Sequence, residues 1–312
     1  MEVGLQLVDK TGSDSAAEMP FQSGYGSEEF QGGYGSEEVD RRSPVRVIGA
    51  HRWAALDLLD LWSHRELFYI LAERDVKVRY KQSALGVAWA ILQPLLTMVI
   101  FTLLFGRLGR MPSAGQPYAI FSYAGLLPWT FFSTVVTTGS NSLINNPNLI
   151  TKVYFPRLLI PISAVGAGLM DLMIASLMLL VIMPLYGVKF HLTLIMFLPL
   201  VALTAMMAAA VSIFTSAANV KYRDIRHALP FAIQTLMFLT PVIYPVSFLP
   251  QQWRWLLMLN PLSGIIEGFR AAIFGNPFDW QGLAISTAIV AGLLTTAAYS
   301  FRRMERQFAD VI

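Results

Sequence analysis

The sequence predicts an all-helical integral membrane protein with six transmembrane helices. Of its 312 residues, 55% are hydrophobic and only 14% are charged, whereas an ordinary soluble domain has about 25% charged residues. A soluble fold of this length could not cover its surface with so few charges. The mean hydropathy is +0.53, and long uncharged segments recur along the chain. The absence of cysteine excludes disulfides, thiolate metal sites and cysteine nucleophiles.

Residues 1–45 are predicted to be a disordered acidic tail. They contain a tandem nonapeptide, FQSGYGSEE followed by FQGGYGSEE, whose Gly, Ser and Glu content cannot bury enough apolar surface to fold. Residues 1–40 carry a net charge of −8, which leaves +11 for residues 41–312. A solvated tail is the simplest interpretation, although Tyr25 and Tyr34 leave a partner-binding or regulatory role open. The basic remainder points to anionic lipid and topology signals, and not to nucleic acid.

Residues 52–81 are expected to hold an amphipathic helix. Ser63 followed by Glu66 has the spacing of a capping box, which places the helix start near His64. Apolar residues then recur at helical spacing, interleaved with basic ones. A basic, aromatic helix beside a membrane span is expected to lie in the plane of the membrane interface.

Hydropathy places the six transmembrane helices within residues 85–305. The predicted spans are 85–105, about 118–140, 158–186, 192–218, 228–246 and about 283–301. The first has 21 uncharged residues, or about 31 Å of helix, which matches the hydrocarbon core. With both termini in the cytoplasm, 17 basic residues face inward and five outward. This distribution predicts an N-in, C-in arrangement.

The connection between the fifth and sixth spans is too apolar for an ordinary loop. Its apolar pieces, within about 246–276, are each too short to cross a membrane. Two short re-entrant helices fit this pattern, because irregular backbone at membrane depth is tolerated only against protein or a water-filled cavity. An amphipathic loop lying on the membrane is the alternative.

The sequence carries few signs of chemistry of its own. It has no G-x-x-x-x-G-K-[ST] and no H-E-x-x-H, and its four histidines are scattered, so neither a phosphate-binding loop nor a metal site is predicted. Asp171 is the only acid within the six predicted spans. An acid at that depth is a functional candidate by default, although a hydrogen bond to a neighbouring helix would also explain it. These observations favour a conduit over an enzyme.

One predicted cytoplasmic connection, residues 141–157, has the composition of a docking element. Turn residues at 145–148 precede an apolar patch at 149–155. A short helix at about 143–156, parallel to the membrane, would present that patch to a soluble partner. A solvated loop, the alternative, would not need so many apolar side chains together.

Three segments resemble the ABC-2 type permeases that export polysaccharides and polyol phosphates, the membrane subunits of O-antigen, capsule and teichoic acid exporters. LAERDVKVRYKQSALGVAWAILQP, from Leu71 to Pro94, is similar to the start of that family. NPNLITKVYFPR at 146–157 resembles its first cytoplasmic loop. TPVIYP at 240–245, together with Asn260-Pro261 and Arg270, resembles its gate region. The resemblance covers residues 60–305 in the expected order, and residues 1–40 have no counterpart in it.

The resemblance implies a permease of the bacterial inner membrane that works as a homodimer with two separate ABC ATPase subunits. ATP and Mg would be bound by the ATPase, so this chain would need no cofactor and would not itself be an enzyme. The expected function is to move a lipid-linked polysaccharide from the cytoplasmic side. An ABC-2 exporter of a smaller lipid or drug, or a polytopic enzyme acting on polyprenyl-linked sugars, are the alternatives.

Candidate site residues fall into four sets. The resemblance assigns ATPase coupling to Asn146, Pro147, Leu149, Ile150, Lys152 and Tyr154, and the gate to Pro241, Tyr244, Pro245, Asn260, Pro261 and Arg270. Arg74, Lys77, Arg79 and Lys81 are candidates for receiving a pyrophosphate, although anchoring on anionic lipid would require the same charges. Sugars present apolar faces to rings and hydroxyls to polar groups, which makes Trp89, Tyr123, Phe131, Phe132 and Thr134 candidates for lining the conduit, although aromatic residues near the ends of spans are also expected as an interfacial belt.

Overall fold

The structure is a computed structural model that describes residues 62–81, 86, 88–152, 155–222 and 224–305. These described residues all belong to one compact unit. The tail expected at residues 1–45 and its nonapeptide repeat lie outside the described residues, and so does Tyr154.

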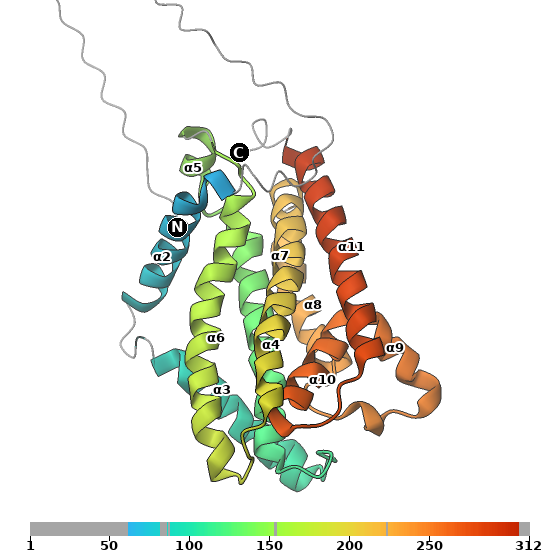
Figure 1. The fold of residues 1–312 in the computed structure, drawn as a ribbon. Coiled ribbons are helices and arrows are strands. Elements are labelled where there is room, and N and C mark those ends of the chain that lie inside the picture. Colours follow the sequence, from blue (N-terminus) through green and yellow to red (C-terminus); the bar gives the residue numbers. More distant parts are fainter. Residues whose placement is uncertain (1–61, 82–85, 87, 153–154, 223, 306–312) are drawn as a thin grey trace, which may run out of the picture. The chain divides into compact units, whose positions relative to one another are not determined.

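All regular secondary structure in the described ranges is helical (Figure 1). The first helices are α2 (Arg65–Lys81), α3 (Ala88–Phe101), which continues as a π-helical stretch (Thr102–Leu108), α4 (Tyr118–Asn141), α5 (Pro147–Lys152) and α6 (Leu159–Leu185). A 3₁₀ turn (Leu192–Met196) leads into α7 (Phe197–Lys221), followed by α8 (Ile225–Leu239), α9 (Arg254–Leu259), α10 (Pro261–Phe274) and α11 (Trp280–Glu305). The start of α2 agrees with the capping-box spacing.

Five of these helices are long and apolar enough to cross a membrane: α3 with its π-helical extension, α4, α6, α7 with its leading turn, and α11. The pair formed by residues 251–259 and α10, called the bent pair below, also passes that test but is bent by 101°, as either one broken span or a re-entrant pair would be. The re-entrant pair expected at 246–276 stays a prediction. The described chain is therefore all-helical with five or six candidate spans. The exact number of spans and the N-in, C-in arrangement stay predictions.

The fifth predicted span differs from the structure. Hydropathy extends it over 228–246, whereas α8 has 15 residues and ends at Leu239. It is about 22 Å long, shorter than the hydrocarbon core. The helix ends because Thr240 precedes Pro241: the proline ring disfavours a helical conformation in the residue before it, and Thr240 is extended, with φ −102° and ψ 140°.

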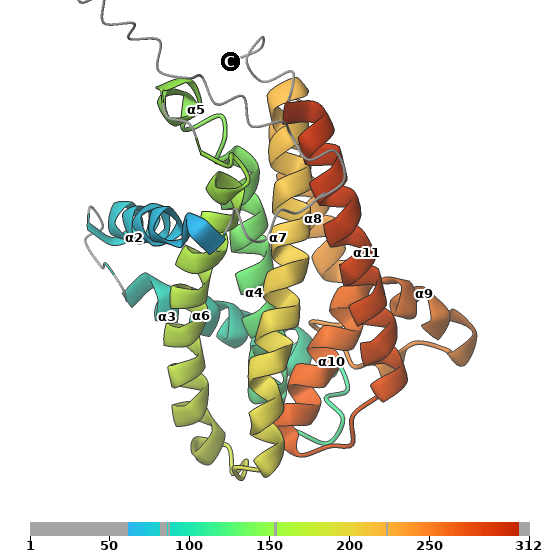
Figure 2. The ribbon, with the colours of Figure 1, turned by 45° about the horizontal axis from the view of Figure 1, so that its top comes forward.

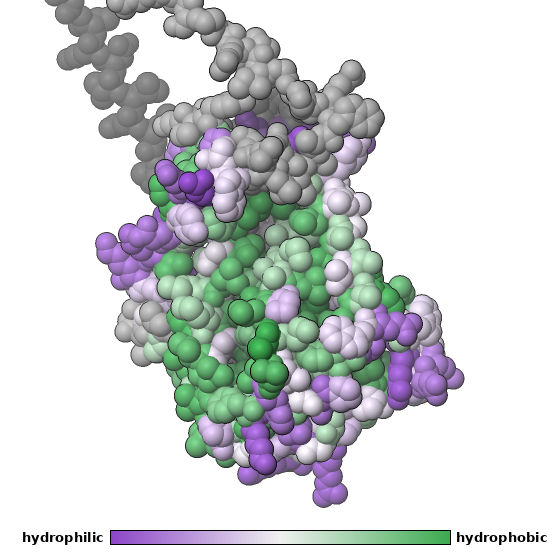
Figure 3. Space-filling view, in the orientation of Figure 1, coloured by the Kyte–Doolittle hydropathy of each residue, from purple (hydrophilic) through white to green (hydrophobic). Residues whose placement is uncertain are grey.

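The core is built around α4, which is 83% buried over its most apolar stretch. It packs against α7, α6, α10 and α3, and Figure 2 shows it enclosed among these helices. Close approach of α4 and α7 depends on Gly139, because a Cβ there would lie 2.7 Å from the Ser212 hydroxyl oxygen. The outer faces of α3 and α6 expose many large apolar side chains, and Figure 3 shows a green band across the middle of the bundle, bordered by hydrophilic residues.

The two ends of the bundle differ in what they present. α5 and the C-terminal ends of α7 and α11 lie together at one end, and the α6–α7 connection lies at the other (Figures 1 and 2). Arg157, just before α6, donates to the Glu305 carbonyl at 3.3 Å and so ties α6 to the end of α11. Leu71 of α2, Phe155 and Phe301 belong to a second buried cluster that joins these elements. This region is called the α5 end below.

Candidate functional site

A side-chain hydrogen bond connects the segment before α5 to α2. Arg74 of α2 donates through Nη1 to the Asn146 amide oxygen at 2.9 Å. Its Nε and Nη2 bind the neighbouring Asp75 carboxylate, which also accepts a hydrogen bond from Ser163 of α6 at 3.3 Å. A continuous chain of polar contacts therefore joins the α4–α5 connection, α2 and α6.

The other basic residues of α2 differ in their surroundings. Lys77 pairs with Glu73 one turn earlier at 2.7 Å, and both side chains are mostly exposed, so this pair contributes little to stability. Lys81 is exposed and has no ion pair within the described part of the chain. Arg79 instead turns towards the bundle and pairs with Asp171 of α6.

Asp171 is held by two consecutive residues of α2. The Arg79 guanidinium and the Tyr80 hydroxyl each donate to one of its carboxylate oxygens, and Arg79 also reaches the Thr138 hydroxyl of α4 at 3.4 Å. Burial, reinforced by the hydrogen bond to Asp171, raises the pKa of the Tyr80 phenol, so Tyr80 stays protonated and donates. Asp171 thus makes the contact to a neighbouring helix that the sequence left open.

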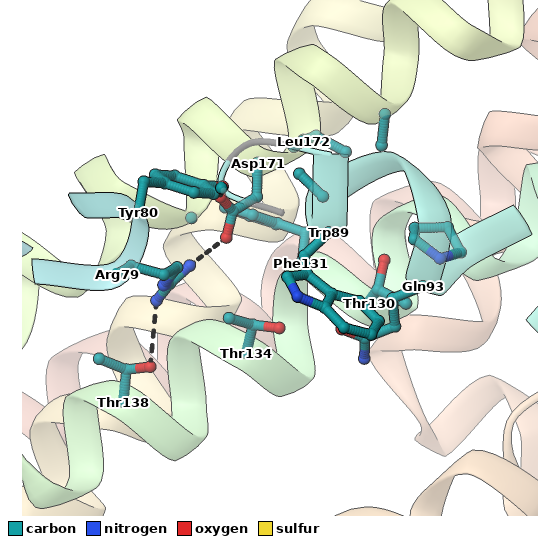
Figure 4. Close-up of a pocket in the computed structure, with 15 residues that line it drawn as sticks. Arg79, Tyr80, Trp89, Gln93, Thr130, Phe131, Thr134, Thr138, Asp171 and Leu172 are labelled. Atoms are coloured by element: carbon teal, nitrogen blue, oxygen red, sulfur yellow. Dashed lines mark hydrogen bonds and ion pairs between the residues drawn. The ribbon is translucent and has the colours of Figure 1, made fainter. Parts of the chain in front are cut away.

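These charged groups border a cavity of about 410 Å³ between α2, α3, α4 and α6. Figure 4 shows Arg79, Tyr80 and Asp171 on one side and Trp89, Gln93 and Thr130 on the other. The lining is Arg79, Tyr80, Gly86, Trp89, Ala90, Gln93, Pro94, Thr130, Phe131, Thr134, Thr138, Gly168, Asp171, Leu172 and Ala175. A second, more open hollow of about 230 Å³ adjoins it and is lined by Ser133, Thr134, Thr137 and Thr138. One face of α4 therefore presents hydroxyl groups along both spaces.

The residues expected to line the conduit separate into two groups. Trp89, Phe131 and Thr134 border the cavity. Tyr123 is fully buried, and its hydroxyl donates to the Ala175 carbonyl at 2.9 Å. Phe132 is also buried and packs against Trp129, with ring centroids 5.9 Å apart.

Arg270 of α10 lies at the centre of the region around the bent pair. It is 3% exposed, and its guanidinium donates to the Val242 carbonyl at 2.7 Å, the Tyr244 carbonyl at 3.4 Å and the Glu267 carboxylate at 2.8 Å. The same group lies 3.8 Å from the Phe121 ring centroid on α4. Arg270 therefore satisfies backbone carbonyls in the extended stretch that follows α8 and joins α10 to α4.

The remaining gate candidates surround this arginine. Asn260 donates to the Thr240 hydroxyl at 2.8 Å and accepts from the Leu262 amide at 3.1 Å, which caps the start of α10 at Pro261. Pro241, Pro245 and Pro261 are buried, and Tyr244 is half-buried. The structure thus brings the six gate candidates into one region, away from the cavity beside α2.

The coupling candidates lie at the α5 end. Asn146 contacts Arg74, Pro147 begins α5 with an exposed ring, and Leu149 is half-buried against the second cluster. Ile150 and Lys152 belong to α5, but their side chains, like Tyr154, are not among the described groups. Within the described part of the chain, no three His, Asp or Glu side chains come together as a metal-binding group.

A family model described as "ABC-2 type transporter" matches residues 66–274. The chain belongs to the ABC-2 type transporter family. The matched region begins in α2 and includes α4, the cavity, α5 and the bent pair through the end of α10. This ABC-2 chain is accordingly a multi-pass membrane transport protein.

Curated relatives of this ABC-2 chain share most of its length. It is 31% identical over 258 residues to the O-antigen export system permease protein RfbA of Myxococcus xanthus, covering 81% of this chain and 98% of the relative. It is 28% identical to a protein of the same name from Klebsiella pneumoniae, covering 79% and 95%. The polysialic acid transport protein KpsM of Escherichia coli is 24% identical, with coverage of 71% and 86%.

Some residues that line the cavity of the ABC-2 chain were not predicted from the sequence. Gln93, Thr130 and Thr138 line the cavity but are not among the residues predicted to line the conduit. The helical spacing of Thr130, Thr134 and Thr138, four residues apart, is a signal that could have found the hydroxyl face of α4. Tyr80 offered no such signal, because its partner Asp171 is 91 residues away.

Proposed function

We propose that the chain is the permease subunit of an ATP-driven exporter that moves a lipid-linked polysaccharide from the cytoplasmic side across the inner membrane. The observation that carries the proposal is the similarity over 81% of the chain and 98% of the relative to an O-antigen export permease. A cavity lined by aromatic rings, threonine hydroxyls and an amide suits a sugar better than a purely apolar cargo. Two copies of the chain and two ABC ATPase subunits would form the working exporter.

The α5 end would face the cytoplasm and the ATPase. Lys221, Arg302 and Arg303 lie at the C-terminal ends of α7 and α11, as the preference of basic residues for the cytoplasmic side requires. α5 would take the coupling role, with Asn146 passing its displacement to α2 through Arg74. The exposed Lys77 and Lys81 would meet the phosphate groups of the substrate lipid.

The energy would come from the partner. The sequence contains no G-x-x-x-x-G-K-[ST] loop, so ATP and Mg would be held by the ATPase subunits. Closure of these subunits around ATP would move α5 and, with it, the helices that enclose the cavity.

The coupling assignment is tested by Leu149→Asp together with Ile150→Asp, in a strain expressing the chain with its ATPase. We expect the ATPase to co-purify about tenfold less well, because charges in an apolar docking patch remove its central contacts. Export should stop while the permease stays monodisperse in the membrane. Leu192→Asp, at an 84% exposed leucine away from α5, is the matched control and should leave co-purification unchanged.

Wild-type export and ATPase co-purification by the double variant would contradict the coupling assignment. The broader proposal would be wrong if no ATPase associates with the chain and the purified chain alone hydrolyses or modifies a glycolipid.

A further inference from the structure

The residues that line the cavity beside α2 carry no net charge. Arg79 and Asp171 are the two charged residues among its 15 described lining residues, and they are paired with each other. A ligand in this cavity therefore meets a neutral, dipolar wall.

An anionic group would bind poorly here. It would lose its hydration on entering a partly buried space, and it would find Arg79 already occupied by the Asp171 carboxylate. To reach Arg79, it would have to displace Asp171, which would keep only the Tyr80 hydroxyl as a donor. The pair is partly buried, so separating its members is unfavourable because each charge is then left poorly solvated and without its partner.

A neutral ring bearing hydroxyl groups meets none of these costs. Trp89 and Phe131 offer aromatic surfaces, while Thr134, Thr138 and Gln93 offer hydroxyl and amide groups that can donate and accept hydrogen bonds. The volume of about 410 Å³ is within the range of small-molecule sites. The adjoining hollow shares Thr134 and Thr138 with the cavity, so it extends the hydroxyl-lined surface beyond a single ring.

We propose that this cavity binds neutral sugar rings, and that Asp171 is a specificity-determining residue that excludes anionic sugars and phosphate groups by occupying Arg79. This inference rests on the proposed function, since it names the class of glycan that the permease accepts. It also assigns Arg79 a different role from the receipt of a pyrophosphate, which would be left to Lys77 and Lys81.

The test measures binding to the full permease in lipid nanodiscs by tryptophan fluorescence. The probes are maltohexaose, which is neutral, and its counterpart with the primary alcohols oxidised to carboxylates. The cavity signal is the fraction of the fluorescence change that Trp89→Phe removes. We expect wild type to bind the neutral probe at least tenfold more tightly than the acidic one.

Asp171→Asn should release Arg79, tightening binding of the acidic probe about tenfold and changing binding of the neutral probe by less than about threefold. Glu73→Gln is the matched control: it removes one carboxylate from α2 that pairs with Lys77 outside the cavity, and selectivity should stay as in wild type. If Asp171→Asn does not fold, the two charges can be exchanged in the double variant Arg79→Asp and Asp171→Arg. The cavity then stays neutral, and the double variant should keep wild-type selectivity.

Equal binding of the two probes to wild type, unchanged selectivity in Asp171→Asn, or no signal dependent on Trp89 would each overturn the inference. The proposed function is judged separately, by ATPase co-purification and export. An exporter that couples to its ATPase but binds both probes equally would refute only the charge selectivity.

Discussion

Replacing Arg270 by methionine should destabilise the region around the bent pair more than any other single removal of charge there. Methionine fills much of the same volume, so the change removes the guanidinium and leaves the packing largely intact. The Val242 and Tyr244 carbonyls and the Glu267 carboxylate would each lose a donor. The contact with the Phe121 ring, 3.8 Å away in the native protein, would be lost as well.

These contacts set the size of the effect. A buried acceptor without a donor costs about 1–3 kcal/mol, and breaking a buried ion pair costs about 3–5 kcal/mol. The terms overlap, because Arg270 serves all its acceptors with a single group and Glu267 is one-third exposed. We therefore expect a loss of about 4 kcal/mol in the free energy of unfolding.

The assay is reversible unfolding in mixed detergent, followed by tryptophan fluorescence. Arg254→Met is the matched control. Arg254 also donates to backbone carbonyls, those of Leu249 at 3.1 Å and Ser247 at 3.4 Å, but it is partly exposed, so water can replace it at a cost below about 1 kcal/mol. Equal losses in the two variants, or a loss below 1 kcal/mol for Arg270→Met, would refute the view that Arg270 holds the stretch after α8 in place.

Two further substitutions test close contacts. A Cβ on Gly125 would lie 2.8 Å from the Arg270 guanidinium and 3.0 Å from the Val242 carbonyl, so Gly125→Ala should lower the free energy of unfolding by about 1–3 kcal/mol in the same assay. A Cβ on Gly292 meets no atom within 4 Å, so Gly292→Ala should be neutral or stabilising. Similar losses in the two variants would contradict the packing argument. Asn146→Ala should lower substrate-stimulated ATPase activity several-fold with less than about 1 kcal/mol lost in stability. The exposed Asn145→Ala serves as its control, and an equal drop there would argue against the contact with Arg74.

Local rules predicted most of the helices. Hydropathy located α3, α4, α6, α7 and α11, because each contains an apolar stretch long enough to cross the hydrocarbon core of a membrane. The proline rule at Thr240-Pro241 was available in the sequence, yet the apolar residues that follow extended the predicted span past it. Hydropathy alone does not distinguish side chains that face lipid from those, such as Val242 and Ile243, that are buried against protein.

The candidate site was less accessible from the sequence because its contacts are long-range. The Lys77–Glu73 pair follows the i, i+4 spacing of a helix, and a sequence can supply it. The Arg79–Asp171 pair joins residues 92 positions apart, and only the packing of α2 against α6 brings them together. The same packing separates Trp89, Phe131 and Thr134, which border the cavity, from Tyr123 and Phe132, which share their chemistry but lie in the core.

The attachment of α2 to α6 also fixes an order of assembly. The partner of Arg79 is synthesised 92 residues later, which at about 5–20 residues per second is roughly 5–20 s of translation. During that interval the Arg79 guanidinium and the Tyr80 hydroxyl have no Asp171 carboxylate to bind, whereas the Lys77–Glu73 pair within α2 can already form. The earliest of the described helices to leave the ribosome is therefore fixed in its final position only after α6 has been inserted.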